Sequence, residues 1–172
     1  MNWYVVFVKT AEEEKIRDFL LQQGLDSFVP KRKMVFRKQG VSSLIEKVIF
    51  PGYLFVESEM DQVSFNEKLW EMKGIKSGIV KLLRYDRKGE ISALYPEEKE
   101  YLEKLLGKNK VLEHSTGLIR GNRVIINEGP LQGFESKIVK IDRHKRTAIL
   151  ELPICGNQTR VTVSLEIVEK IN

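Results

Sequence analysis

The sequence predicts an α+β fold in which a mixed first domain is followed by a small all-β domain. Apolar strand-like runs alternate with amphipathic helical segments as far as Gly107. Residues 108–117 then carry Asn, Ser, Thr and Gly without apolar periodicity. Short strand-like runs separated by turns occupy the remainder. We therefore expect a first domain over 1–107, a linker over 108–117 and a β domain over 118–172.

The first domain is expected to contain an inserted hairpin and three helices. Its strand-like segments are 3–8, 28–35, 44–50, 53–56 and 79–83, and its helices begin near Thr10, Asp61 and Pro96. Thr10 and Glu13 have the spacing of a capping box, and Gln39-Gly40 is typical of a hairpin turn. The order strand, helix, strand, strand, helix, strand is that of a ferredoxin-like domain.

The second domain is expected to be a small barrel. Its five strand-like runs are 123–126, 137–141, 148–152, 160–165 and 167–171. Closure into a barrel is expected because it removes the exposed edges of so short a sheet.

The composition is that of an ordinary soluble globular protein, with 42% hydrophobic and 31% charged residues among 172. The net charge is +5, a modest basic excess. Cys155 is the only cysteine, which excludes an internal disulfide and fits a reducing, cytoplasmic setting. The apolar run 3–8 lacks a basic leader and is followed by charges, so we expect neither a signal peptide nor a membrane span.

Three aromatic residues surround the Pro51-Gly52 turn: Phe50, Tyr53 and Phe55. Tyr53 and Phe55 point to the same side of the expected strand because side chains alternate along it. Such a cluster belongs either to the core or to an exposed patch that docks on another protein. Both interpretations stay open at this stage.

Three segments in this order and spacing resemble the NusG family of transcription elongation factors: 3–6, 50–53 and 121–130. The likeness covers nearly the whole chain. It implies a ferredoxin-like NGN domain followed by a five-stranded, SH3-like KOW barrel. The basic, compact form is most similar to specialised paralogs of the LoaP or RfaH kind, LoaP-like antiterminators above all. One departure is Ser136, which stands where KOW motifs usually have a glycine two residues after the aromatic at Phe134.

The resemblance also implies roles for single residues. The NGN domain would dock on the clamp helices of RNA polymerase through the matching positions Phe7, Phe50, Tyr53 and Phe55. The non-template DNA strand would pass near Lys9, Lys15 and Lys73, although lysines are most often simply solvated. Phe134 matches a position that contacts termination factor Rho or a small-subunit ribosomal protein, and it could equally plug the end of the barrel.

Two clusters of basic residues favour contact with nucleic acid. The first places five cations in eight residues with no acid among them, and Lys47 lies on the returning strand: Lys31, Arg32, Lys33, Arg37 and Lys38. On a hairpin these could track phosphates, or they could protect a solvated edge strand.

The second basic cluster lies in a turn of the barrel, and two further arginines, Arg120 and Arg123, stand at the start of the barrel. The turn cluster consists of Lys140, Arg143, His144, Lys145 and Arg146. Forked arginine donors suit phosphates and guanine edges, and proteins read RNA sequence in loops and hairpins. A hairpin in the nascent transcript is therefore the expected ligand, in keeping with the LoaP likeness; plain surface charge is the alternative.

No catalytic constellation is apparent. His114 and His144 have no second ligand at metal spacing, Cys155 has no histidine nearby in sequence, and no glycine-rich phosphate loop occurs. We therefore expect no enzyme activity, no metal and no cofactor. The sequence favours a transcription elongation and antitermination factor. An RNA-binding protein of translation or ribosome assembly is the alternative, and a hydrolase using Cys155 is a more distant one.

Overall fold

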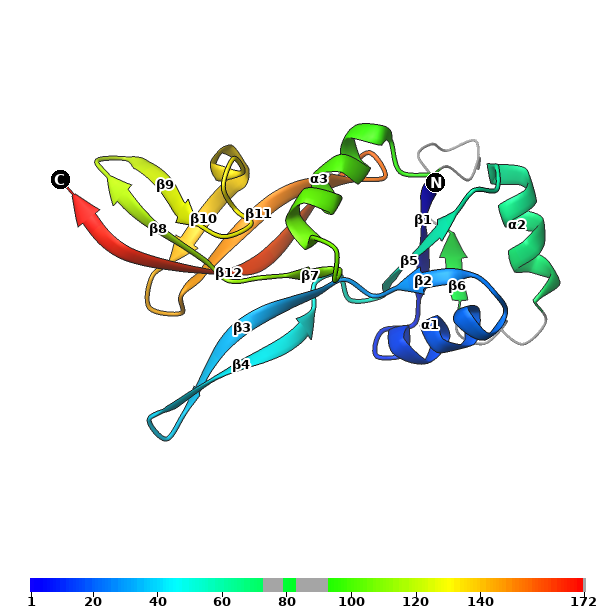
Figure 1. Ribbon diagram of the computed structural model, residues 1–172, viewed down its shortest axis with the longest axis horizontal. Coiled ribbons are helices and arrows are strands. Elements are labelled where there is room, and N and C mark those ends of the chain that lie inside the picture. Colours follow the sequence, from blue (N-terminus) through cyan, green and yellow to red (C-terminus); the bar gives the residue numbers. More distant parts are fainter. Residues whose placement is uncertain (73–78, 83–92, 172) are drawn as a thin grey trace. The chain divides into compact units, whose positions relative to one another are not determined.

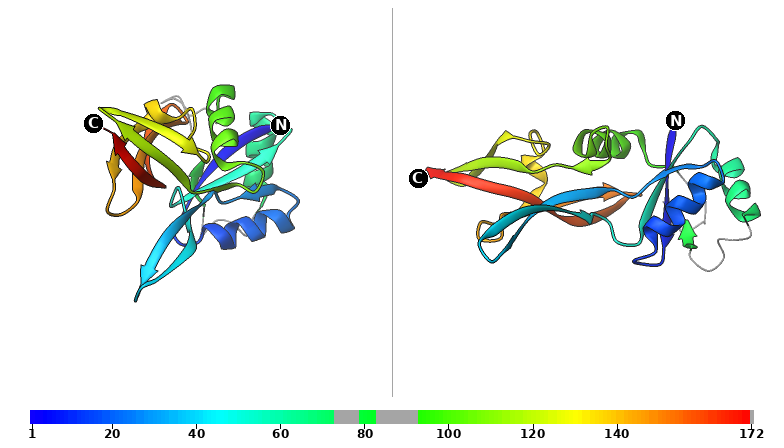
Figure 2. Two further views of the ribbon diagram at one scale, coloured as in Figure 1. Left: turned by 60° about the vertical axis from the view of Figure 1, so that its left-hand side comes forward. Right: turned by 60° about the horizontal axis from the view of Figure 1, so that its bottom comes forward.

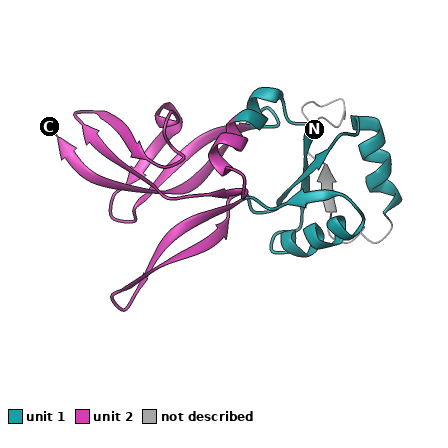
Figure 3. Cartoon of the chain, viewed as in Figure 1, with its two compact units in different colours: residues 1–30, 50–100, 154–157 teal, residues 31–49, 101–153, 158–172 magenta. Residues whose placement is uncertain are grey.

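The computed structural model describes residues 1–72, 79–82 and 93–171. It divides into two compact units, drawn in two colours in Figure 3. Unit 1 comprises residues 1–30, 50–100 and 154–157, and unit 2 comprises residues 31–49, 101–153 and 158–172.

Unit 1 contains a four-stranded antiparallel sheet in the order β2-β5-β1-β6 (Figure 1). Its strands are β1 (Asn2–Val8), β2 (Asp26–Phe28), β5 (Tyr53–Ser58) and β6 (Ile79–Leu82). Helix α1 (Glu13–Gln22) joins β1 to β2, and α2 (Gln62–Glu71) joins β5 to β6. This order of strands and helices confirms the ferredoxin-like prediction.

The core of unit 1 forms where the apolar periodicities meet. Central β1 is buried from Trp3 to Val6, as expected of a continuous apolar run covered on both faces. The helices contribute one face each: α1 buries Ile16 and Leu20, and α2 buries Phe65 and Leu69. In each helix the two buried apolar residues are four positions apart, which confirms the apolar face predicted from helical spacing.

The start of α2 was predicted correctly from the sequence, whereas the cap of α1 was not. Asp61 caps α2 as expected, with its carboxylate accepting a hydrogen bond from the Ser64 N–H at 2.8 Å. The capping box expected from Thr10 and Glu13 is wrong, because Glu12 occupies the N-cap position without a side-chain cap bond. The Glu13 carboxylate is instead used in a contact with another part of unit 1, described below.

Unit 2 includes a two-stranded ribbon made of β3 (Lys31–Lys38) and β4 (Val41–Val48). Short β7 (Val111–Leu112) extends it to a sheet in the order β4-β3-β7. Gln39 and Gly40 form the predicted turn, with φ of 51° and 80°. The tip of the ribbon projects away from the rest of unit 2 (Figure 2).

The remaining strands of unit 2 form a five-stranded sheet in the order β10-β11-β12-β8-β9. They are β8 (Ser115–Arg120), β9 (Arg123–Glu128), β10 (Ile138–Asp142), β11 (Thr147–Ile154) and β12 (Asn157–Ile171), with a short 3₁₀ turn, Glu135–Lys137, before β10. Burial alternates along β11, so that every second residue enters the core. The predicted small five-stranded domain is confirmed.

Two details differ from the expected strands. Segments 160–165 and 167–171 belong to one continuous strand, β12, because Glu166 is an outward-facing residue and not a turn. The first strand of the sheet is β8, and it begins inside 108–117, the expected linker. Ser115 is buried opposite Leu165, so this polar stretch is held by backbone pairing that apolar periodicity does not reveal.

Helix α3 (Pro96–Leu106) begins at the predicted proline and ends before Gly107. Its first half belongs to unit 1 and its second half to unit 2. Among the described residues, no helix has the length and apolar character needed to cross a membrane.

Candidate functional site

Two of the four residues expected to dock on another protein are buried in the core. Phe50 is 3% exposed and Phe55 is 0% exposed. The Phe55 ring stacks on Phe28 at 5.5 Å and lies 5.9 Å from the Phe50 ring. The docking role expected for Phe50 and Phe55 is therefore corrected, because their rings are packed on all sides and leave no surface for a partner.

The other two residues, Phe7 and Tyr53, are half-buried neighbours. They lie opposite each other on β1 and β5, and their rings meet edge to face at 5.7 Å. Cross-strand aromatic pairs of this kind are a stable unit of sheet surface. The structure thus reduces the expected docking patch to the pair Phe7 and Tyr53.

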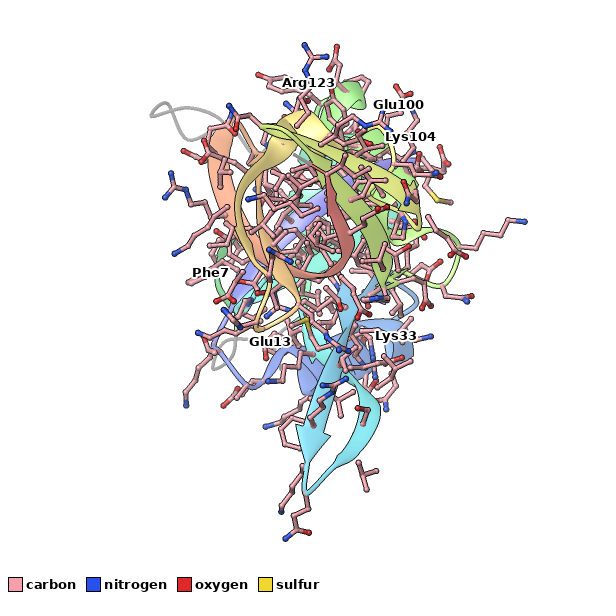
Figure 4. The ribbon with its side chains drawn as sticks, turned by 90° about the vertical axis from the view of Figure 1, so that its left-hand side faces the viewer. Phe7, Glu13, Lys33, Glu100, Lys104 and Arg123 are labelled. Carbon is pink, nitrogen blue, oxygen red and sulfur yellow. The ribbon has the colours of Figure 1, made fainter. Side chains whose placement is uncertain are left out.

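The carboxylate of Glu13, which was expected to take part in a capping box, instead holds the turn before Tyr53. Glu13 is almost fully buried, and its Oε1 accepts a hydrogen bond from the Gly52 N–H at 2.7 Å. A Cβ at Gly52 would lie 2.9 Å from Cε2 of Phe7, so glycine allows the Phe7 ring to pack over this turn. Figure 4 labels Phe7 and Glu13. The available signal was helical spacing, since Glu13 shares a face with Ile16 and Leu20.

The basic cluster of the β3–β4 ribbon is partly used within unit 2. The Arg32 guanidinium donates a hydrogen bond to the Thr162 carbonyl, and burial lowers the pKa of Arg32. Lys33, labelled in Figure 4, forms an ion pair with Glu113 at 2.8 Å, and this contact raises the pKa of Lys33. These two side chains hold the base of the ribbon rather than facing solvent freely.

The outer half of the ribbon is different. Arg37 and Lys38 are exposed near the tip, whereas Lys31, at the base of the ribbon, is half-buried. Arg37 donates from Nε to the Ser42 hydroxyl at 3.0 Å, which fixes the guanidinium beside the turn. Of the five cations expected to contact phosphates, Arg37 and Lys38 are the two that the structure presents most openly.

The second basic cluster lines a groove in unit 2, which we call the basic groove. Its volume is about 660 Å³. Its lining combines four cationic or imidazole side chains of the predicted cluster with two isoleucines and two carboxylates: Lys140, Ile141, Asp142, Arg143, His144, Arg146, Glu166 and Ile167. Lys145 belongs to the same turn and is exposed beside it.

Hydrogen bonds hold the turn that carries these cations. Asp142 accepts a hydrogen bond from the Lys145 N–H at 2.9 Å, and this bond lowers the pKa of Asp142. Arg146 has a φ of 53°, in the left-handed region that non-glycine residues rarely adopt. Its carbonyl accepts a hydrogen bond from the Leu165 N–H at 3.0 Å. The positive φ and this backbone hydrogen bond place Arg146 at the end of the turn, beside the groove.

The other predicted basic residues are scattered. Lys9 is exposed and pairs with Glu12 at 3.4 Å, and Lys15 is exposed on α1. Lys73 lies outside the described residues. Arg120 and Arg123 face each other across the β8–β9 turn and do not line the basic groove.

Comparison with known proteins identifies a family for this chain. The family model described as "NusG: Transcription termination factor nusG" matches residues 1–103. The chain is 30% identical over 170 residues to the transcription termination/antitermination protein NusG of Chlamydia trachomatis, covering 93% of this chain and 89% of the relative. This chain belongs to the NusG family.

Other NusG relatives match over nearly their full length. The protein of Borreliella burgdorferi is 26% identical, with 98% of both chains covered. The protein of Thermus thermophilus is 24% identical, with 99% of this chain and 98% of the relative covered. Both carry the name transcription termination/antitermination protein NusG. The sequence-based resemblance to this family is confirmed.

Phe134, expected at a partner-binding position of the NusG family, is 6% exposed. The ring of Tyr101, from the second half of α3, meets it at 6.0 Å, and Lys137 Nζ lies 5.4 Å from the Tyr101 ring. In this structure Phe134 packs into the core of unit 2, and its expected contact with a partner stays a prediction. Ser136 has no positive φ, so the missing KOW glycine reflects an ordinary backbone angle.

Cys155 does not have the properties of a nucleophile in this NusG-family chain. The residue is buried, and desolvation, reinforced by the nearby Glu98 carboxylate, raises the pKa of its thiol to about 12. The reactive thiolate is therefore scarce at neutral pH. Within the described residues, no group of three or more His, Cys, Asp or Glu side chains could hold a metal ion.

Proposed function

We propose that this chain is a transcription elongation and processive antitermination factor that binds RNA polymerase through its first domain and a hairpin of the nascent RNA through its second. The proposal takes 1–107 as the NGN domain, 118–172 as the KOW domain and 108–117 as their connection. The observation that carries it is the basic groove in a member of the NusG family. The specialised, LoaP-like role remains part of the proposal, on the basis of the sequence resemblance alone.

The polymerase contact is assigned to Phe7 and Tyr53. Both are half-buried, so each ring has apolar surface left for the clamp helices, and Tyr53 retains a phenol for the polar rim of an interface. Tethering the second domain to a bound polymerase raises its local concentration near emerging RNA. Two modest contacts then act as one stable complex.

The polymerase contact is tested by co-purification with Phe7→Ala and Tyr53→Ala variants of the full chain. We expect each to retain less polymerase than the unmodified chain. Tyr95→Ala is the matched control, because Tyr95 is an exposed tyrosine elsewhere in unit 1. Equal retention by folded Tyr53→Ala and Tyr95→Ala chains would reject this surface.

The RNA contact is assigned to the basic groove. Arginine and lysine side chains here can neutralise phosphates, and binding should then weaken as salt rises, with a slope of about −0.7 per phosphate contact on a single strand. Arg143→Ala should reduce both affinity and slope. Arg146→Gly is the sharper variant, because it removes the guanidinium while relieving the left-handed φ of 53°.

The functional experiment is readthrough of a terminator by purified polymerase. We expect the unmodified chain to raise readthrough on templates that encode its leader hairpin, and Arg146→Gly to lose this effect while still binding polymerase. The exposed Arg160, which lies outside the groove, supplies the control Arg160→Ala. Co-sedimentation with ribosomes but not with polymerase would replace the proposal with a role in translation or ribosome assembly.

Two further contacts are part of the proposal. Lys9 and Lys15, with Lys73, would lie near the non-template DNA strand, which electrostatic attraction to exposed lysines supports. Rho or a small-subunit ribosomal protein would contact Phe134 only after Tyr101 has moved. Such a partner should therefore bind a Tyr101→Ala chain more tightly than the unmodified chain.

A further inference from the structure

The basic groove contains a carboxylate that phosphate binding alone does not explain. Glu166, on β12, lines the groove together with Arg143 and Arg146, and its side chain is 34% exposed. A negative charge at this position repels the phosphates that the surrounding cations would attract. Its presence favours recognition of a group that donates hydrogen bonds.

Each of the two carboxylate oxygens of Glu166 has a nitrogen atom nearby, but both oxygens can still accept hydrogen bonds. Arg146 Nη2 lies 3.4 Å from Oε1, and His114 Nε2 lies 3.8 Å from Oε2. Both distances exceed the ordinary N–H···O range of about 2.7–3.2 Å. In the part of the chain that the structure describes, no hydrogen bond to this carboxylate is present. His114 is itself fixed, because its Nδ1 lies 2.7 Å from the Ser164 hydroxyl.

A carboxylate with two available acceptors fits a base that offers two adjacent donors. Unpaired guanine does so on its Watson–Crick edge, through N1–H and the 2-amino group, whereas the corresponding edges of adenine, cytosine and uracil each include at least one acceptor among the matching positions. Proteins read unpaired bases on this edge. Ile141 and Ile167 line the same groove and offer apolar surface to the face of a base, while the cations suit the flanking phosphates.

We propose that Glu166 is the specificity-determining residue of the basic groove and selects an unpaired guanine nucleotide in the bound RNA. This inference rests on the proposed RNA-binding function and names the base that the groove reads. Arg146 and His114 flank the carboxylate, which lines the groove. Guanine binding adds two direct hydrogen bonds to a carboxylate whose neighbouring nitrogens lie at 3.4 and 3.8 Å.

The test uses the full chain and short oligouridine probes with one central guanine, inosine or adenine. A pair of hydrogen bonds to a base edge discriminates by about tenfold to hundredfold, so we expect the guanine probe to bind that much more tightly than the adenine probe. Inosine lacks the 2-amino group and should fall between them. Binding is measured by fluorescence anisotropy at one fixed salt concentration.

Glu166→Gln supplies the decisive variant. Its amide offers one donor and one acceptor, the pattern that pairs with adenine, so the preference for guanine should vanish or turn toward adenine. Glu169→Gln is the matched control, since Glu169 is exposed on the same strand and the substitution changes the net charge equally. Both variants should gain general affinity for RNA, but only Glu166→Gln should change the ratio between probes.

Two results would overturn the inference: equal binding of guanine and adenine probes by the unmodified chain, or an unchanged ratio in Glu166→Gln. Failure to bind any oligonucleotide would instead remove the RNA-binding function. In that case, titration with GMP and AMP, followed by NMR, decides whether the groove takes a free guanine nucleotide. A Glu166-dependent preference for GMP keeps the assignment of Glu166, and no preference rejects it.

Discussion

The carboxylate of Glu13 accepts a hydrogen bond from the backbone N–H of Gly52, although the two residues lie 39 positions apart. This bond joins the first turn of α1 to the turn that precedes β5. Tyr53 follows that turn directly, so the candidate docking pair depends on a buried polar contact that neither Phe7 nor Tyr53 makes itself.

Replacing Glu13 by alanine should leave the buried Gly52 N–H without its acceptor. We expect the free energy of unfolding to fall by about 1.5–3 kcal/mol, the usual value of a hydrogen bond to a charged group. Glu13→Gln keeps an oxygen acceptor and should lose less. Urea unfolding followed by circular dichroism measures both, with Glu97→Ala, an exposed position on α3, as control. Equal losses in Glu13→Ala and Glu97→Ala would contradict the role of this bond.

Replacing Gly52 by alanine should be costly for two separate reasons. Its φ is +83°, and a Cβ would lie 2.9 Å from Cε2 of Phe7 and 3.3 Å from the Val8 carbonyl oxygen. The backbone strain alone costs about 1–3 kcal/mol. Gly24→Ala isolates that part, because Gly24 has a φ of +76° with nothing within 4 Å of its added Cβ. The excess loss in Gly52→Ala over Gly24→Ala then measures the contact with Phe7.

Removing the Tyr101 ring should weaken unit 2 and uncover Phe134. The edge-to-face pair contributes about 0.5–1.5 kcal/mol beyond the burial of its area. Tyr101→Ala should therefore lower the free energy of unfolding, whereas Tyr101→Phe, which keeps the ring, should lower it much less. A Tyr101→Phe chain as unstable as Tyr101→Ala would assign the stability to the hydroxyl and not to the ring pair.

Stability should depend on pH through Asp142. The hydrogen bond from the Lys145 N–H holds the folded-state pKa of Asp142 below its ordinary value. Such a group stabilises the fold above the unfolded pKa, which is about 3.9, and loses this contribution as pH falls through the lower folded value. The difference in melting temperature between the unmodified chain and Asp142→Asn should therefore be constant at neutral pH and shrink in acid. A difference that grows on acidification would contradict the sign.

The Cys155 thiol should be inert in the folded chain. Its pKa of about 12 leaves almost no thiolate at pH 8, and burial denies access to reagents. Reaction with a chromogenic disulfide reagent should be slow in buffer and fast in denaturant. Rapid labelling of the native protein would show that the turn around Cys155 opens readily.

The fold was largely predictable because its signals are local and repeated. Apolar stripes gave the helices, Pro96 and Asp61 marked helix starts, and Gln39-Gly40 marked the ribbon turn. Strand β8 was missed because Ser115 is buried by backbone pairing and a close approach to Gly129, where an added Cβ would lie 2.6 Å from the His114 carbonyl oxygen. Such tertiary contacts leave no periodic pattern in the sequence.

The candidate sites were only partly predictable for a similar reason. The cluster around Arg143 and Arg146 was visible as a run of charge, but that it lines a groove is seen only in the structure. The burial of Phe50 and Phe134 was not visible, because aromatic residues suit cores and interfaces equally. Glu166 was missed because it stands alone between apolar residues, and only β12 brings it beside Arg146.

The continuity of β12 places Glu166 of the basic groove on the same strand as core residues of unit 2. Val163 and Leu165 face inward, while Ser164 and Glu166 occupy the alternate positions. A slip of one residue would carry the carboxylate into the apolar interior, where burial of an unpaired charge is costly. Strand movements of this kind are therefore closed to β12, and a change in the base that we propose Glu166 selects would require substitution of groove side chains.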